Sequence, residues 1–165
     1  MPRAGIALGS NLGDRMAQLH EAIRLIEKIA VNNEPFLKAR IYQTDPLHCP
    51  PDSPDFLNTV VEFGFEGSAE KLLEHTRAIE KSMGRTANPQ RNAPRLIDVD
   101  ILYLGEERRD SIDLVLPHPR LHERRFALQP LADIRPELIL PGQSKPISCL
   151  LNELADKDGI LVEVV

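Results

Sequence analysis

The stretch APRLIDVDILYLG, residues 93–105, decides the fold because it carries a clear period of two. Ile97, Val99 and Ile101 alternate with Asp98 and Asp100, so the apolar side chains leave one face of a strand and the carboxylates leave the other. We predict a strand over 95–104 whose apolar face packs on helices. The two carboxylates then share the opposite face, roughly 7 Å apart along the backbone.

The segments before this strand predict a β-α-β-β-α-β order. Apolar runs predict strands at 5–8, 37–44 and 56–65, and apolar residues spaced three or four apart predict helices over 14–30 and 68–83. This order is typical of a ferredoxin-like core in an α+β protein, an α/β sandwich forming a single domain over 1–165. As C-terminal additions we expect a short strand at 114–116, a helical turn at 126–131, a short helix at 147–154 and a final strand at 160–165.

Composition restricts the class of protein. The 165 residues are 42% hydrophobic and 27% charged, with a net charge of -5. No apolar run approaches the ~20 residues of a membrane helix, and residues 1–11 turn polar too soon for a signal peptide. We therefore expect a cytoplasmic protein without membrane contact, monomeric, with Cys49 and Cys149 as free thiols. The negative charge argues against a general nucleic-acid binder.

Two interpretations of the paired carboxylates are open. Asp98 and Asp100 are either two scattered acids on a solvated strand face, or a site for a cation that relieves their mutual repulsion. Hard divalent ions such as Mg²⁺ take oxygen ligands, commonly one or two carboxylates completed by water and substrate phosphates.

Basic residues flank the carboxylates on both sides in the sequence. The two segments contain Arg85, Arg91 and Arg95, and then His118, Arg120, His122, Arg124 and Arg125. Any one arginine is explained by a surface salt bridge, but the clusters favour phosphate binding, because the planar guanidinium matches phosphate oxygens. GSNLGD at 9–14 lacks the lysine of a phosphate-binding P-loop and is interpreted as a strand-to-helix turn. Carboxylates beside arginines indicate phosphoryl transfer.

Several longer motifs carry a resemblance to a known family. They are ALGSNLGDR (7–15), YQTDPL (42–47), FLNTVVEF (56–63), PRLIDVDILYLG (94–105) and LPHPRLHERRFALQPLADIRPEL (116–138), together with the helix end at Glu80 to Arg85. With these motifs the chain resembles 6-hydroxymethyl-7,8-dihydropterin pyrophosphokinase, an enzyme of folate biosynthesis. The resemblance implies transfer of pyrophosphate from ATP to the pterin hydroxymethyl group with release of AMP.

The resemblance also implies roles for individual residues. Asp98 and Asp100 match ligands of two Mg²⁺ ions, and Arg85 and Arg95 match catalytic arginines that grip the phosphates. Pterin-binding positions are matched by Thr44, Pro46, Leu47, Phe56, Asn58 and Phe126. ATP-binding positions are matched by Arg77, Glu80, His118 and Arg124. Either aspartate is a candidate acceptor for the hydroxyl proton, and the proline-bearing loops 45–55 and 85–94 are candidate lids.

Two other functions compete with this one. Ferredoxin-like sheets also form RNA-binding modules that stack bases on aromatic side chains, but aromatic residues are only 4% of this chain. A different metal-dependent phosphotransferase or nucleotidyl transferase would release ADP or free pyrophosphate instead of AMP.

Overall fold

The computed structural model describes residues 1–11, 13–44, 56–84, 97–154 and 161–164. Its elements are β1 (Arg3–Ser10), α1 (Arg15–Glu27), β2 (Leu37–Lys38), β3 (Ile41–Thr44), β4 (Phe56–Gly64), α2 (Ala69–Ser82), β5 (Asp98–Leu104), β6 (Arg109–Asp110), β7 (Val115–Leu116), the 3-10 helix η1 (Leu121–Glu123), α3 (Arg125–Ile134), α4 (Ile147–Asn152) and β8 (Leu161–Val164).

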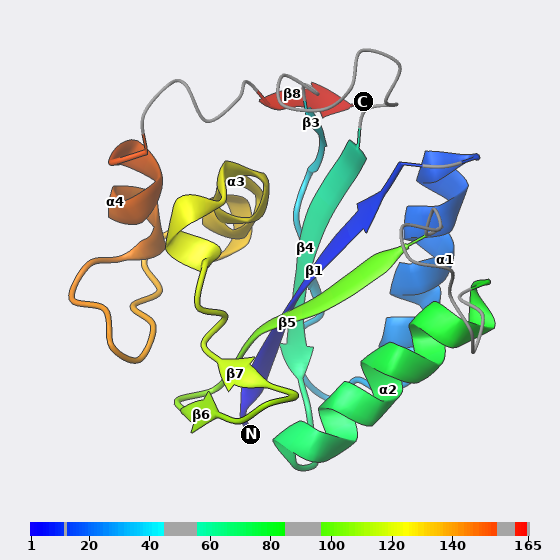
Figure 1. Ribbon diagram of the computed structural model, residues 1–165, viewed down its shortest axis with the longest axis horizontal. Helices are drawn as coiled ribbons and strands as arrows, with labels where there is room; N and C mark the ends of the chain where they lie inside the picture. Colours follow the sequence, from blue (N-terminus) through cyan, green and yellow to red (C-terminus); the bar gives the residue numbers. More distant parts are fainter. Residues whose placement is uncertain (12, 45–55, 85–96, 155–160, 165) are drawn as a thin grey trace.

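The main sheet has the strand order β5-β1-β4-β3-β8, with β2 also paired to β4, and its strand pairs are antiparallel. The first, second, third and fourth predicted strands thus take the ferredoxin-like order, and β8 extends one edge. In Figure 1, α1 and α2 lie on one side of this sheet, and α3 and α4 lie on the other. The α+β prediction is confirmed, and the C-terminal helices add a third layer.

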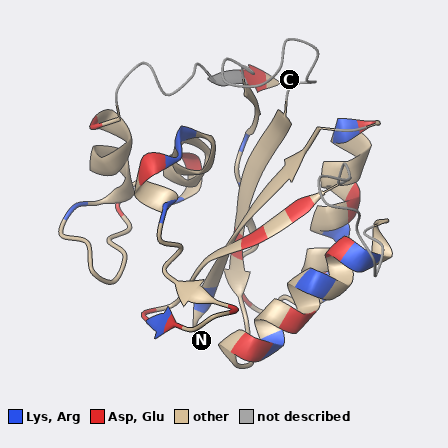
Figure 2. Ribbon diagram, viewed as in Figure 1, with Lys and Arg blue, Asp and Glu red and all other residues tan. Residues whose placement is uncertain are grey.

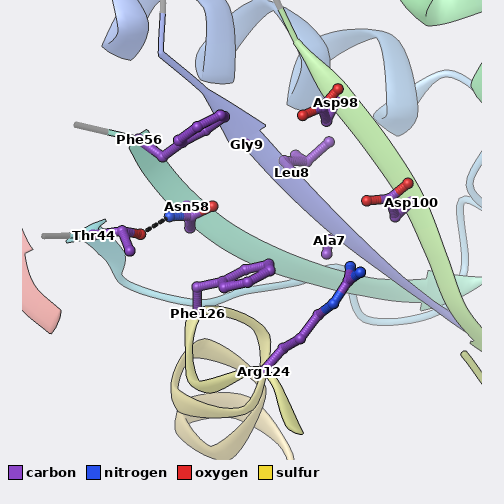
Figure 3. A pocket seen from close by; sticks show the side chains of 10 residues that line it. All are labelled: Ala7, Leu8, Gly9, Thr44, Phe56, Asn58, Asp98, Asp100, Arg124 and Phe126. Carbon is purple, nitrogen blue, oxygen red and sulfur yellow. Dashed lines mark hydrogen bonds between the residues drawn. The ribbon is translucent and has the colours of Figure 1, made fainter. Parts of the chain in front are cut away.

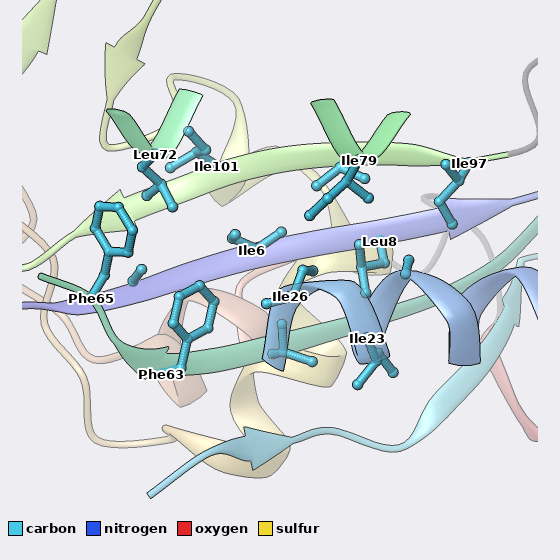
Figure 4. Packing of buried hydrophobic residues seen from close by; sticks show 14 of the residues in the cluster. Ile6, Leu8, Ile23, Ile26, Phe63, Phe65, Leu72, Ile79, Ile97 and Ile101 are labelled. Carbon is cyan, nitrogen blue, oxygen red and sulfur yellow. The ribbon is translucent and has the colours of Figure 1, made fainter. Parts of the chain in front are cut away.

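The larger part of the core lies between the sheet and α1 with α2. Figure 4 shows apolar side chains from β1, β4 and β5 meeting those of the two helices, including Ile6, Phe63 and Ile101 from the sheet. Both helices begin as the sequence predicts: Asp14 caps α1 by accepting from the Ala17 N–H, and Ser68 caps α2. The alternation at 97–101 is confirmed, since Ile97, Val99 and Ile101 belong to this core.

The opposite face of the sheet is only partly covered. There α3 and α4 bury a second cluster around Val60, Leu102 and Leu128. Helix α3 packs on β3 and β4. On the same face of the sheet, β1 and β5 therefore remain accessible near one end of these strands. A cleft lies in this uncovered part.

The strand predicted over 37–44 is interrupted, and the prediction of one continuous strand is wrong. Lys38 pairs with Val61 and Tyr42 with Asn58, so four steps on one strand match three on the other. The extra residue makes a bulge. The hydroxyl of Thr59 lies 3.2 Å from the carbonyl oxygen of residue 39 and 3.0 Å from that of residue 40, donating to this irregular backbone.

A second bulge changes the alternation within β5. Ile101 pairs with Ile6 but Tyr103 pairs with Gly5, so Leu102 and Tyr103 together face one residue of β1. Both side chains consequently enter the α3 layer. Gly5 is required here, because a Cβ on it would lie 2.3 Å from the Tyr103 ring.

The C-terminal elements differ in extent from their predictions. The helical turn predicted at 126–131 is a ten-residue helix, α3, that continues past Pro130. The strand predicted at 114–116 is present as β7, but it pairs with β6, which was not predicted. The final strand is confirmed as β8 on β3. Within the described ranges no helix has the length and apolar character to cross a bilayer, and Cys149 is an exposed free thiol, while Cys49 lies outside them.

Candidate active site

The main cleft opens on the uncovered part of the sheet and joins four strands to the start of α3. It encloses about 660 Å³, including the open solvent at its mouth. Figure 3 shows the side chains that line it: Ala7, Leu8, Gly9, Thr44, Phe56, Asn58, Asp98, Asp100, Arg124 and Phe126. Seven of the residues predicted from the sequence to bind substrates or metal therefore meet in one place, although they come from β3, β4, β5 and the start of α3.

The floor of the cleft is the bare backbone of β1. Ala7 and Gly9 of β1 line the cleft, and both are small, whereas the intervening Leu8 is buried in the core on the other side of the strand. A flat ligand can therefore lie close to the strand. The sequence analysis missed this role, although the spacing of small residues along 5–9 was its visible signal.

The two carboxylates stand beside this floor. In the register of the sheet Asp98 lies opposite Gly9 and Asp100 opposite Ala7, so β1 places no bulky side chain next to them. Asp100 is exposed and Asp98 is half-buried, which leaves both accessible from the cleft. Figure 2 shows the acidic positions along β5 against the largely uncharged strands next to it.

These two carboxylates fit a hard divalent cation. Among the residues that the structure describes, no group of three or more His, Cys, Asp or Glu side chains gathers as a metal site. Two oxygen donors from the protein leave the remaining coordination positions to water and phosphate oxygens, as Mg²⁺ prefers, whereas structural zinc sites use four nitrogen or sulfur ligands.

Two aromatic rings form facing walls of the cleft. Phe56 projects from β4 and Phe126 from the first turn of α3, on either side of Asn58 (Figure 3). The guanidinium carbon of Arg124 lies 5.5 Å from the centre of the Phe126 ring, within the range of a cation–π contact. The same residue thus contacts an aromatic wall and brings positive charge into the cleft.

The amide of Asn58 has a defined orientation. Its Nδ2 donates to the hydroxyl of Thr44 on the neighbouring strand. Its Oδ1 points over Gly9, where a Cβ would approach it to 3.1 Å. Because Asn58 is 6% exposed, the side chain is held by its surroundings and presents an acceptor toward the floor of the cleft.

Two polar contacts hold α3 against the sheet and so position Phe126. The hydroxyl of Tyr42 on β3 donates to Asp133 at 2.7 Å. Arg135 at the helix end forms an ion pair with Glu62, which is completely buried on β4. Tyr42 and Glu62 lie on inner strands of the sheet. The helix therefore cannot slide along the sheet without breaking one of these two polar contacts.

A second cleft adjoins the first at Asp100, which lines both. It runs along the edge of β5 and is bounded by α2 and the β6–β7 connection. Its lining is mixed. The apolar members are Leu73, Val99, Ile101, Ile112, Leu114, Val115 and Pro119, and the polar members are Thr76, Asp100, Asp113 and His118. Burial, followed by the nearby charge of Arg124, lowers the pKa of His118 against the opposing effect of Asp100, so the imidazole is neutral near pH 7.

A model of the family described as 7,8-dihydro-6-hydroxymethylpterin-pyrophosphokinase (HPPK) matches residues 5–136, a range that contains the lining residues of both clefts. The chain belongs to the HPPK family. It is 37% identical over 156 residues to the 2-amino-4-hydroxy-6-hydroxymethyldihydropteridine pyrophosphokinase of Haemophilus influenzae, covering 94% of this chain and 95% of that one. With the Bacillus subtilis protein of the same name the identity is 42% over 131 residues, covering 79% and 77%.

Larger proteins contain a similar segment. A folate synthesis bifunctional protein of Arabidopsis thaliana is 40% identical over 129 residues, which are 78% of this chain but only 26% of that protein. The crystal structure of wild-type Plasmodium falciparum HPPK-DHPS with SDX-DHP superimposes with a TM-score of 0.69 at 15% identity, covering 93% of this chain and 43% of that one. This last similarity concerns the fold alone.

Two of the ATP-binding residues predicted for this HPPK family member lie outside the lining of both clefts. Glu80 is 7% exposed on α2, and its carboxylate accepts the N–H of Val99 at 3.1 Å, between the two aspartates. Arg77 is exposed on the same helix and faces Asp113 at 3.9 Å across the rim of the second cleft. His118 lines the second cleft and Arg124 lines the main cleft, and their ATP-binding roles stay predictions.

Four other predicted residues, Pro46, Leu47, Arg85 and Arg95, lie outside the described residues, as do both candidate lids, 45–55 and 85–94. Their roles stay predictions from the family resemblance.

Proposed function

We propose that this HPPK family member transfers the β,γ-diphosphate of ATP to the hydroxymethyl group of 6-hydroxymethyl-7,8-dihydropterin and releases AMP. One observation carries the assignment: an aromatic-walled cleft and a second cleft meet at Asp100, and Asp98 lies beside it in the first cleft. A transferase for two flat substrates needs two such clefts, and the reacting groups must come together where they meet.

The main cleft suits the pterin. A flat bicyclic ring gains from stacking between Phe56 and Phe126, and the small residues of β1 allow it to approach the sheet. The edge of the pterin carries hydrogen-bond donors, and the Oδ1 of Asn58 is oriented to accept a hydrogen bond from one of them. In this pose the hydroxymethyl group points along the cleft toward β5.

The second cleft suits the nucleoside part of ATP, with the triphosphate directed toward Asp100. Its apolar walls along β5 and α2 match a purine base, and it is open toward the shared carboxylate. Arg124 brings a permanent positive charge into the main cleft at the start of α3, where it is available to the transferred phosphates.

We propose Mg²⁺ as the metal and Asp98 with Asp100 as its protein ligands. When bound, the ion neutralises negative charge on the phosphate oxygens as the bond breaks. The dependence on Mg²⁺ and the number of two ions come from the family resemblance.

The protein contributes positioning and charge to the transfer step. The pterin hydroxyl oxygen forms a bond to the β-phosphorus, while the bond from that phosphorus to the α–β bridging oxygen breaks and its electron pair leaves with AMP. The hydroxyl proton passes to an acceptor in the cleft, for which Asp98 and Asp100 remain the two candidates. The positive charge of Arg124 stabilises the developing charge on the phosphoryl oxygens.

Product identification tests the proposed function. The protein is incubated with ATP, Mg²⁺ and the hydroxymethyl-dihydropterin, and the products are followed by phosphorus NMR and mass spectrometry. We expect AMP and a pterin diphosphate in equal amounts. Formation of ADP, or of free pyrophosphate without a modified pterin, would assign the chain a different transferase or hydrolase activity.

Substitution of the carboxylates tests the site. Asp98→Asn and Asp100→Asn are each expected to lower kcat by about 10³-fold or more, by analogy with other groups that organise phosphoryl-transfer charge. The matched control is Asp110→Asn, an exposed acid on β6, which should retain full activity. Full activity in either cleft variant would remove the metal assignment. A cytoplasmic, monomeric protein remains our proposal from composition.

A further inference from the structure

The connection between β6 and β7 carries an isoleucine whose side chain is not buried by the fold. Ile112 has a relative exposure of 104%. Its neighbours are ordered: the N–H and hydroxyl of Ser111 donate to the Leu114 carbonyl at 3.0 and 2.9 Å. Such short connections usually carry Gly, Asn, Asp, Ser or Pro, so the backbone has no need of a β-branched apolar residue here.

A single exposed apolar side chain is ordinary on a protein surface, but Ile112 has a specific location. It lines the second cleft, whose other wall includes Leu73 and Thr76 of α2. The ion pair between Arg77 and Asp113, at 3.9 Å, joins α2 to the connection next to Ile112. The connection therefore lies at the rim of the cleft, and Ile112 presents apolar surface to a ligand that enters it.

We propose that Ile112 is a nucleotide-binding residue that covers the base of ATP in the second cleft. This inference rests on the proposed function, because it takes ATP as the occupant. Val99, Ile101 and Leu114 supply apolar surface deeper in the cleft, and Ile112 adds a wall at its rim. Binding of a purine removes apolar area of the isoleucine from water, which stabilises the complex and not the free protein.

Replacement of Ile112 should therefore change the affinity for ATP without changing the stability of the free protein. Since the side chain is fully exposed in the free protein, its replacement removes no folding contact, and the free energy of unfolding should not change. Partial burial of an isoleucine by the base is expected to account for about 3- to 10-fold in ATP affinity. The effect should be confined to the base, because the phosphates lie toward Asp100.

The test compares Ile112→Ser and Ile112→Val with the wild-type protein and with Ile139→Ser as a matched control. Ile139 is 48% exposed between α3 and α4 and lies outside the lining of both clefts. Dissociation constants for MgATP and for magnesium tripolyphosphate are measured by calorimetry, KM and kcat by the AMP assay, and stability by urea unfolding.

We expect Ile112→Ser to weaken MgATP binding about 3- to 10-fold, with Ile112→Val close to the wild type. Tripolyphosphate binding, the KM for the pterin and the urea midpoint should not change, and Ile139→Ser should match the wild type throughout. MgATP binding within twofold of the wild type in Ile112→Ser, or an equal loss for tripolyphosphate, overturns the inference. Both outcomes leave the proposed function intact, because that depends on the products formed by the wild-type protein.

Discussion

Removal of either aromatic wall should weaken pterin binding while leaving ATP binding and folding nearly unchanged. Phe56 and Phe126 face each other across the main cleft and are both only partly buried in the free protein. Their rings therefore remain available to stack on a ligand. Phe56→Ala and Phe126→Ala test this role separately, because the two residues lie on different elements.

The expected magnitude follows from the contacts of each ring. Stacking of a flat heteroaromatic ring on one aromatic side chain contributes about 1–3 kcal/mol by alanine substitution, which corresponds to about 5- to 150-fold in affinity. Phe126 also carries the cation–π contact with Arg124 at 5.5 Å, about 0.5–1 kcal/mol at an accessible site. Because that contact is already present in the free protein, its loss does not add to the loss of pterin affinity, and we expect effects of similar size from Phe56→Ala and Phe126→Ala.

The assay is an equilibrium titration of pterin fluorescence in the presence of an unreactive ATP analogue, together with KM values for both substrates. The matched control is Phe63→Ala on the other face of β4, which is completely buried. It should lose about 3–5 kcal/mol of unfolding free energy, a cost that the two cleft variants avoid in large part. Pterin affinity within twofold of the wild type in both cleft variants, or an equal rise in the KM for ATP, would refute the stacking argument.

Two further predictions concern buried polar contacts. Glu80→Ala removes the acceptor of the Val99 N–H and should lower the unfolding free energy by about 1.5–3 kcal/mol and speed exchange of that amide, whereas Glu80→Gln, which keeps an oxygen acceptor, should lose less. An unchanged exchange rate in Glu80→Ala would contradict this assignment. Burial, then the hydrogen bond to Asp133, raises the pKa of Tyr42 to about 12, so its contribution to stability is complete below about pH 10 and declines as the pH rises toward that value. Urea unfolding across this range should show a shallower decline for Tyr42→Phe than for the wild type, and parallel curves would argue against it.

The sequence predicted the strands and helices of the core wherever the apolar residues recur with the regular spacing of a strand or of a helix. The alternation at 97–101 predicted the apolar face of β5 and also predicted that the two carboxylates share the opposite face, because successive side chains of a strand point to opposite faces. The same rule failed at Leu102 and Tyr103, where a bulge places consecutive side chains on one face. That bulge depends on Gly5 of another strand, so local periodicity carries no sign of it.

The chain sequence by itself determined the types of groups available: paired acids on one strand, arginines around them, and phenylalanines in two distant segments. Only the tertiary structure decided that Phe56 and Phe126 face each other, because their separation is set by how α3 is held on β3 and β4. It also decided that Glu80 contacts the backbone of β5 and that Ile112 lies at the rim of a cleft. The physical reason is that side-chain chemistry is a local property, whereas distances between segments follow from packing of the whole core.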